Sequence, residues 1–290
     1  MNDIRIIKQS EYDDAKRVWR LCFPDDSDEF IDYYFARRTS PELILGAFSR
    51  CGELIGTLHL LPREISFLGH PKRICFVAGV GTVPSMRHKG IASAMFEAAY
   101  PLMKKRGFCA SILQPFNVGF YERLGYEPFV YAGIGEINTA CLLDVPLPCV
   151  IAPDADKMLS IYNAFMRPFT GFALRDKACF ENLISEFSLS GSVTVMTENS
   201  YAFCCIEGSC ANVYESAGDI TTSLTLLASR YSSVKALVPT LYSDVFGVKQ
   251  SVFNMIKVID EDVLISHTGF STAAEAVAHA KKTALSFDRY

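Results

Sequence analysis

A short loop with the sequence RHKGIAS, residues 87–93, combines cationic side chains with small residues at the start of a predicted helix. A helix N-terminus offers backbone N–H groups without intrahelical partners and the positive end of the helix dipole. Gly90 lets an anion approach the backbone closely, and Arg87 and Lys89 add positive charge. The segment therefore predicts a phosphate or diphosphate site. The alternative interpretation is an ordinary strand-to-helix turn with solvated basic residues. The residues of the predicted cradle are Arg87, His88, Lys89, Gly90, Ile91, Ala92 and Ser93.

A second segment, NVGFYERLGYEPF, begins 24 residues after the last residue of this loop. Asn117 is a typical helix N-cap and Gly125 a typical C-terminal stop, so a short helix is predicted between them. Tyr121 would lie on that helix, where its phenol can donate or accept a proton. The alternative interpretation of Tyr121 is a tyrosine that only packs in the core.

The elements that must position these segments follow from apolar periodicity and from turn residues. In the first half the sequence predicts helices at 10–22 and 25–38, strands at 42–49, 53–61, 64–68 and 73–83, a helix at 90–105, a strand at 109–114, a helix at 117–124 and a strand at 126–134. A linker at 144–153 contains three prolines and divides the chain.

The second half roughly repeats this order. It predicts helices at 154–166 and 176–187, strands at 192–197, 201–207 and 211–216, a helix at 219–231, a strand at 234–238 and a short helix near Tyr242. A strand-like segment at 251–265 and a helical segment at 271–287 follow, and the sequence does not fix what they pack against. The fold class predicted is α/β (α+β), with two tandem mixed-sheet domains.

With both segments in this order, residues 4–135 resemble the GNAT superfamily of acyl-CoA-dependent N-acyltransferases. The loop matches the family's Q/RxxGxG/A motif, with alanine at a position where many relatives have glycine. The second segment matches its Asn…Tyr…Gly-aromatic motif. The matching residues are Arg87, Gly90, Ala92, Asn117, Tyr121, Gly125 and Tyr126.

This resemblance implies a binding mode for acetyl-CoA as co-substrate. The pantetheine arm would pair with the backbone of Val80, Gly81, Thr82 and Val83 like an added strand. The diphosphate would rest on the N–H groups of residues 88–93. Asn117 would hold the arm, and Tyr121 would protonate the departing CoA thiolate as general acid. An amine would attack the thioester directly, without an acyl-enzyme.

The tandem layout is similar to the enhanced-intracellular-survival (Eis) group of aminoglycoside and lysine acetyltransferases. We therefore expect a catalytic GNAT domain at 1–138, a degenerate GNAT-like domain at 150–262 and a C-terminal tail at 263–290. The turn before the second unit's helix, 214–220, contains Gly218 but no Arg or Lys. In that group a third domain supplies its C-terminal carboxylate as the base. Whether Tyr290 does so here stays open, because only about thirty residues remain, too few for such a domain.

The sequence specifies the acceptor and the general base less closely than the acetyl-CoA site. The segment FPDDSDEFIDYYF places carboxylates beside aromatic rings, which suits a primary amine such as a polyamine, an amino sugar or lysine; a solvated acidic helix face explains it equally well. The strand at 73–83 contains neither a carboxylate nor a histidine. Water, His59 or Glu64 are the candidates for the base, and His59 fits a core position equally well.

Composition excludes several classes of function. With 290 residues, 50% hydrophobic content and net charge −4, we expect a folded protein that binds neither nucleic acid nor membranes. Ten cysteines without a regular framework, and no export or membrane signal, predict a cytoplasmic protein. Five histidines without paired spacing and the lack of CxxC predict no metal, and GxSxG is absent. A non-catalytic acyl-CoA-binding regulator stays the alternative, and the oligomeric state, monomer or homo-oligomer, stays open.

Overall fold

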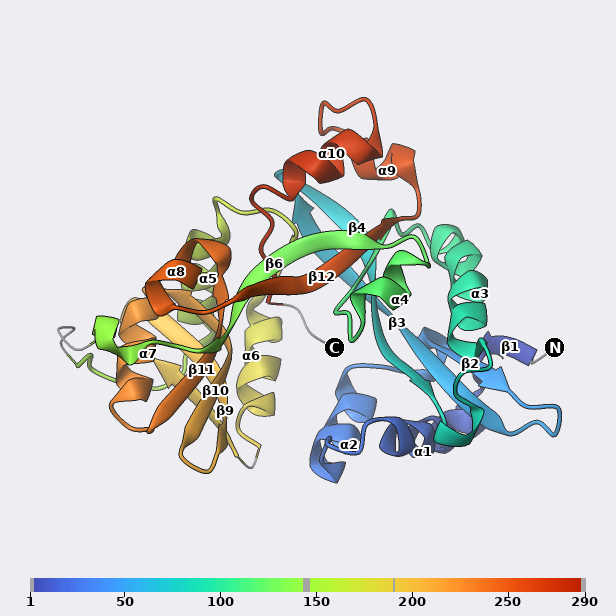
Figure 1. Ribbon diagram of the computed structural model, residues 1–290, viewed down its shortest axis with the longest axis horizontal. Coiled ribbons are helices and arrows are strands. Elements are labelled where there is room, and N and C mark those ends of the chain that lie inside the picture. Colours follow the sequence, from blue (N-terminus) through green and yellow to red (C-terminus); the bar gives the residue numbers. More distant parts are fainter. Residues whose placement is uncertain (1–2, 143–146, 190, 288–290) are drawn as a thin grey trace.

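The computed structural model describes residues 3–142, 147–189 and 191–287 (Figure 1). Its first half contains β1 (Asp3–Ile6), α1 (Tyr12–Cys22), α2 (Asp28–Arg37), β2 (Ile44–Phe48), β3 (Leu54–Phe67), β4 (His70–Thr82), α3 (Ile91–Lys105), β5 (Ala110–Leu113), α4 (Val118–Glu122) and β6 (Glu127–Glu136). Short 3-10 turns lie at η1 (Gln9–Glu11), η2 (Pro41–Leu43), η3 (Pro84–Met86) and η4 (Thr139–Leu142).

The second half has a comparable order of elements. It contains α5 (Ala155–Met166), β7 (Phe172–Ala173), α6 (Lys177–Glu186), β8 (Ser192–Met196), β9 (Ser200–Glu207), β10 (Cys210–Gly218), α7 (Ile220–Ala228), β11 (Ser233–Pro239), η5 (Thr240–Tyr242), α8 (Ser243–Phe246), β12 (Gln250–Val258), α9 (Glu261–Ile265) and α10 (Ala273–Ala280). The carboxylates of Asp154, Asp176 and Asp219 cap α5, α6 and α7 by accepting a backbone N–H three residues on. These local signals explain why the helix starts could be predicted.

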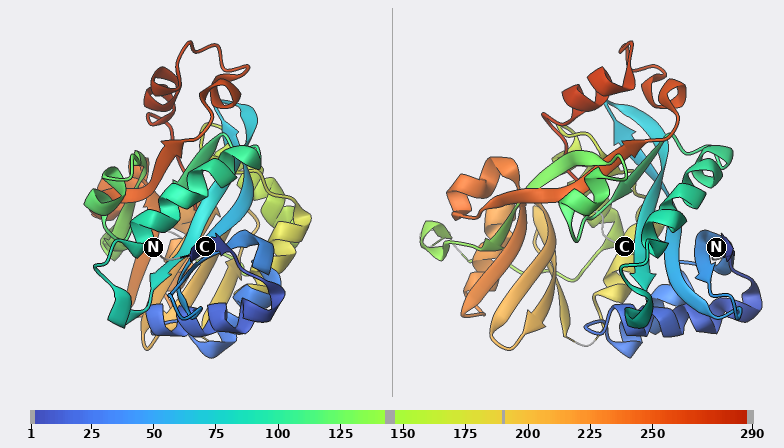
Figure 2. Two further views of the ribbon diagram at one scale, coloured as in Figure 1. Left: turned by 90° about the vertical axis from the view of Figure 1, so that its right-hand side faces the viewer. Right: turned by 45° about the vertical axis from the view of Figure 1, so that its right-hand side comes forward.

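All strands belong to one mixed sheet in the order β1-β2-β3-β4-β5-β12-β6-β11-β10-β9-β8, with β7 paired to β3. The two halves exchange their last strands. β12 pairs with β5 from Met255–Leu113 to Val258–Ala110, and β6 pairs with β11 from Lys235–Glu136 to Pro239–Ala132. β6 and β12 also pair with each other, and Figures 1 and 2 show them side by side as they cross between the halves. Each half therefore completes the sheet of the other.

The hydrophobic core also extends across the boundary between the halves. One cluster spans both halves and brings together Phe67, Phe129, Tyr162 and Phe253, which are fully buried or nearly so. A second cluster fills the first half around Trp19 and a third the second half, so the halves share apolar surface. Burial of large aromatic side chains at a shared boundary makes separation of the halves costly.

Two sequence-based predictions at the start of the sheet were wrong. No strand was expected before the first helix, yet β1 pairs with β2. The segments 53–61 and 64–68 were expected as two strands and form the single strand β3, with Pro62 in its middle opposite Cys75. Pairing of β3 with β2 ends at His59 and pairing with β7 begins at Ile65. Pro62 therefore lies on a free edge, where its missing N–H breaks no ladder.

The C-terminal segment covers the β3–β4 hairpin. The ammonium of Lys72 on β4 donates to the carbonyl oxygens of Val263 (2.8 Å) and Ser266 (2.7 Å), so it caps the end of α9. The segment expected as strand-like at 251–265 is β12 followed by α9. Within the described residues, no helix combines the length and apolar character that a membrane crossing requires.

Candidate active site

The strands β4 and β5 diverge near the middle of the sheet. Their parallel pairing runs from Ile74–Ala110 to Val77–Leu113, whereas β4 continues to Thr82. Beyond Val77, β4 thus has a neighbour on the β3 side but no paired strand on the β5 side. An unpaired strand edge inside a sheet is a template for an extended, amide-containing ligand.

The backbone direction at this edge is fixed by two hydrogen bonds. Val83 N–H donates to the carbonyl oxygen of Ile55 on β3 (3.0 Å). The backbone N–H and C=O groups of successive residues point to alternate sides of a strand. Those of Gly81 and Val83 therefore point toward β3, and those of Thr82 point toward the opening. The guanidinium Nε of Arg87 donates to the Thr82 carbonyl oxygen (3.1 Å), as this direction requires.

A bulge interrupts β4 next to the opening. The register with β3 shifts between Thr57 and His59, and Gly79 has φ +54°. A Cβ at Gly79 would lie 2.6 Å from the ring of Trp19, so a side chain has no room there. Bulges of this kind redirect backbone polar groups, and they are frequent beside active sites.

The loop after β4 ends in an open helix N-terminus. Gly90 precedes α3 with φ +75° and provides no side-chain cap, and the helix's first backbone hydrogen bond runs from Ala94 to Gly90 (3.0 Å). The N–H groups of Ile91, Ala92 and Ser93 therefore have no carbonyl within the helix. A Cβ built on Gly90 meets no atom within 4 Å, which means that the space before the helix is clear. A diphosphate fits this space and this polarity.

Cationic side chains surround the same N-terminus. Arg87, His88 and Lys89 are exposed, and His88 adopts φ +62°. The ammonium of Lys89 donates to the Ser85 carbonyl oxygen (3.2 Å), which keeps the side chain near the turn. Neither loop cation is neutralised by a carboxylate among the described residues. The net positive potential favours an anionic ligand.

The helix α4 places the second motif beside β5. Asn117 caps the helix, because its side-chain oxygen accepts the Phe120 N–H (2.9 Å). Tyr121 is 3% exposed and packs edge-on against Phe96 and Phe116. Burial raises the pKa of Tyr121 well above its usual value, so the phenol stays protonated. Its hydroxyl has no hydrogen-bond partner in the part of the chain that the structure describes.

Residues 3–129 match the family model described as "Acetyltransferase (GNAT) domain". This part of the chain is a GNAT acetyltransferase domain. No curated protein matches the sequence. The match identifies a GNAT acetyltransferase domain over less than half of the 290 residues, and this class uses acyl-CoA and an acceptor. In the described residues, no group of three or more His, Cys, Asp or Glu side chains could hold a metal ion.

Solved structures share the architecture of the whole chain. A probable N-acyltransferase from Enterococcus faecalis aligns with TM-score 0.73 and 14% identity, covering 91% of this chain and 74% of that one. A GCN5-related N-acetyltransferase from Kribbella flavida aligns at 0.71 with 16% identity, covering 93% and 75%. Eis1 from Mycobacterium abscessus aligns at 0.67 with 15% identity, covering 89% and 74%. At these identities the similarity concerns the fold.

The two side chains considered as bases occupy different environments in the GNAT domain. His59 is fully buried; its Nδ1 is 2.9 Å from the Tyr34 hydroxyl and its Nε2 has no partner. Burial lowers the pKa of His59 to about 3, so the imidazole is neutral and sealed from solvent. Glu64 is exposed and lies five residues further along β3, about 16 Å from His59 at 3.3 Å per residue. Tyr290 lies outside the described residues.

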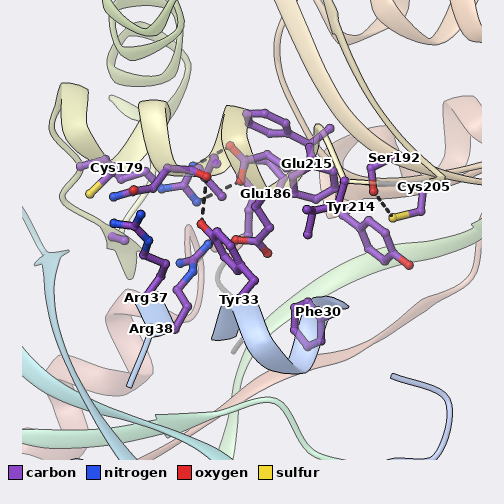
Figure 3. A pocket seen from close by; sticks show the side chains of 18 of the residues that line it. Phe30, Tyr33, Arg37, Arg38, Cys179, Glu186, Ser192, Cys205, Tyr214 and Glu215 are labelled. Carbon is purple, nitrogen blue, oxygen red and sulfur yellow. Dashed lines mark hydrogen bonds and ion pairs between the residues drawn. The ribbon is translucent and has the colours of Figure 1, made fainter. Parts of the chain in front are cut away.

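A cavity of about 720 Å³ separates the GNAT domain from the second half. Its walls come from α2 and β3 on one side and from α6, β9 and β10 on the other. Figure 3 shows Tyr33 and Arg37 of α2, and Arg38 directly after it, near Cys179 and Glu186 of α6. The cavity does not include the β4 edge or the start of α3, so it is distinct from the diphosphate cradle.

Charged side chains of both signs line this cavity. Two of its arginines are held in ion pairs. Arg175 binds Glu215 with two hydrogen bonds of 2.6 and 2.9 Å, and Arg38 pairs with Glu186 across the two halves. The carboxylates of the wall are Asp25, Asp26, Glu29, Glu64, Glu186 and Glu215, and the guanidinium groups are Arg37, Arg38, Arg63 and Arg175. The excess of carboxylates favours a ligand with at least one positive charge.

Sequence reasoning missed the second-half side of this cavity. Arg175 follows β7, a two-residue strand, and Glu215 follows a bulge in β10 where Tyr214 is inserted. Neither residue belongs to a motif, and they are 40 positions apart. The tertiary fold brings the segment after β7 beside β10, so no local pattern signals the pair.

Proposed function

We propose that this GNAT enzyme transfers acetyl from acetyl-CoA to a primary amine at one site per chain, the opening between β4 and β5. The observation that carries the proposal is the continuity of two features. The unpaired edge of β4 beyond Val77 leads into the uncapped N-terminus of α3 at Gly90. One feature matches an extended amide chain and the other a diphosphate, in the order in which they occur in CoA.

In this placement the diphosphate accepts hydrogen bonds from backbone N–H groups between His88 and Ser93. Arg87 and Lys89 flank it, and their hydrogen bonds to Thr82 and Ser85 can be exchanged for phosphate oxygens. The pantetheine amides pair with β4 within Val80–Val83, chiefly through Thr82, whose polar groups face the opening. Asn117 keeps its NH₂ for the arm, because its oxygen is used in the cap.

The thioester then lies near the bulge at Gly79, where a neutral amine attacks the carbonyl carbon. The C–N bond forms, the C–S bond breaks, and the nitrogen loses its proton to water. Tyr121 supplies a proton to the departing thiolate, and the phenolate is then reprotonated from solvent. The raised pKa of its phenol keeps the proton in place at physiological pH until it is transferred. Positioning and charge stabilisation account for most of the acceleration, because the thiolate is a good leaving group.

The second half is proposed to be a degenerate GNAT-like unit, with the boundaries 1–138, 150–262 and 263–290. It retains the parallel pair β10–β11 with the helix α7 between the two strands, but the carboxylate of Asp219 caps α7 and occupies the anion position. The acceptor is proposed to bind in the cavity that this unit walls.

The test is equilibrium binding of acetyl-CoA by calorimetry, combined with mass spectrometry of acetylated products from a panel of primary amines. Product detection is preferable to thiol reagents, because the chain itself has ten cysteines. We expect one acetyl-CoA per chain and at least one acetylated amine. Tight binding without a product from any amine, unchanged in Tyr121→Phe, would instead indicate a regulatory acyl-CoA-binding protein.

A further inference from the structure

The wall that α2 contributes to the cavity changes charge along its length. Glu29, Tyr33 and Arg37 are spaced four residues apart and therefore share one face of the helix. Eight residues of helix separate Glu29 from Arg37, which corresponds to about 12 Å. Asp25 and Asp26 add carboxylates before the helix, and Arg38 adds a guanidinium at its end. The wall is acidic at one end, aromatic in the middle and basic at the other.

The acidic end is coupled to the reaction site. The Asp26 carboxylate accepts a hydrogen bond from the indole nitrogen of Trp19 (2.8 Å). The same indole packs against Gly79, where a Cβ would lie only 2.6 Å away. Asp26 is thus connected through a single rigid ring to the bulge at which we place the thioester. We place the reacting amine at this end of the cavity, because the carboxylates there attract an ammonium group.

The basic end offers donors that the protein itself does not satisfy. Arg37 has no ion pair or hydrogen bond within the described residues. Arg38 pairs with Glu186 through one terminal nitrogen, while its Nε is buried without a partner. Arg175, by contrast, is fully engaged by Glu215. The guanidinium of Arg37 suits a carboxylate, because it can donate two parallel hydrogen bonds to the two carboxylate oxygens. The buried Nε of Arg38 is a further donor without a partner.

Resting on the function proposed above, we infer that the cavity selects acceptors that carry a carboxylate about 10 Å from the reacting amine. The amine lies at the Asp26 end and the carboxylate at the Arg37 end. A simple diamine satisfies the acidic end but places its second ammonium against Arg37 and Arg38, which is unfavourable. The acceptor class is therefore a zwitterion with separated charges, such as an ω-amino acid, and not a polyamine.

The test compares three acceptors of equal length: 8-aminooctanoate, its primary amide and 1,8-diaminooctane. Acetylated products are quantified by mass spectrometry at saturating acetyl-CoA. We expect kcat/KM for the carboxylate to exceed that for the amide at least tenfold, mostly through KM. In Arg37→Gln this ratio should fall to about one, because kcat/KM for the carboxylate falls more than kcat/KM for the amide. Arg37→Lys should restore part of the preference.

Arg50→Gln is the matched control, because Arg50 is exposed in the turn between β2 and β3, outside the cavity. It should leave the ratio unchanged. Equal rates for all three acceptors, a preference for the diamine, or an equal loss for all three in Arg37→Gln would overturn the inference and leave the acetyltransferase function intact. Acetylation of other amines only would likewise overturn the inference and leave the acetyltransferase function intact. If no amine is acetylated, the proposed function fails and this inference with it.

Discussion

The N-termini of α3 and α7 occupy corresponding places in the two halves. The helix α3 connects the parallel strands β4 and β5, and α7 connects the parallel strands β10 and β11. At α3 the cap is Gly90, without a side chain, and cations surround it. At α7 the cap is Asp219, whose carboxylate accepts the Thr222 N–H (3.4 Å) and hydroxyl (2.7 Å). The same backbone arrangement is thus open to an anion in one half and closed by the chain's own anion in the other.

The glycines beside these starts show the same contrast. Gly90 has empty space around a built Cβ, whereas a Cβ at Gly218 would lie 2.1 Å from the Asn199 carbonyl oxygen. The glycine before α7 therefore serves packing, and the glycine before α3 leaves room for a ligand. We therefore expect one acetyl-CoA site per chain because of side chains and local space, not because of topology.

The largest effect is expected for Gly90→Glu, which places a carboxylate where we expect the diphosphate. Calorimetry should show at least a 100-fold loss of acetyl-CoA affinity. Gly107→Glu is the matched control, because Gly107 also has φ +75° and open space, but lies at the other end of α3. It should suffer the same backbone strain and bind acetyl-CoA normally. Equal affinity in both variants would contradict the placement of the cradle.

Tyr121→Phe should lower kcat about 10- to 100-fold with little change in acetyl-CoA affinity, because it removes only the proton donor. The raised pKa of Tyr121 also sets the sign of the pH effect. The acid is active below its pKa, so wild-type kcat should show no basic decline caused by this group up to pH 10. A steady-state pH profile measures both. A decline centred near pH 10 that disappears in Tyr121→Phe would show that the phenol titrates normally.

Lys257→Met tests whether the second half supports the site of the first. The Lys257 ammonium on β12 donates to the Leu124 carbonyl oxygen (2.7 Å) at the end of α4 and lies over the Tyr100 ring. Its loss should displace Tyr121 slightly and reduce kcat about fivefold, with KM for acetyl-CoA unchanged. Lys249→Met, an exposed change just before β12, should have no effect. An unaltered kcat in Lys257→Met would show that α4 needs no support from β12.

The smallest effect is expected for Asp219→Asn, which removes the charge but keeps a good N-cap. Stability should change little, as for the matched cap variant Asp176→Asn. Calorimetric titration should still give one acetyl-CoA per chain, because no cation flanks α7. A second bound equivalent would mean that the carboxylate of Asp219 alone closes the second half.

Much of the fold could be predicted, because the signals are local. Asn117, Asp154, Asp176 and Asp219 start helices through hydrogen bonds to residues three positions away, and the sequence shows both partners. The helix that begins after Gly90 was predicted from its apolar spacing, and the diphosphate cradle at its start stays a prediction.

The rest depends on contacts between distant residues. The exchange of β6 and β12 joins residues more than 100 positions apart, and the hydrophobic pattern of β12 does not specify its neighbour. The continuity of β3 through Pro62 depends on where β2 and β7 end. The cavity exists only between the halves, so Arg37 and Arg175 carry no signal in the sequence.

A crystal structure of the chain with CoA tests the central claim most directly. We expect diphosphate oxygens within about 2.7–3.2 Å of backbone nitrogens between His88 and Ser93, with the pantetheine arm along β4 at Thr82. A nucleotide bound elsewhere, or a start of α3 closed by the chain's own side chains, would contradict the account.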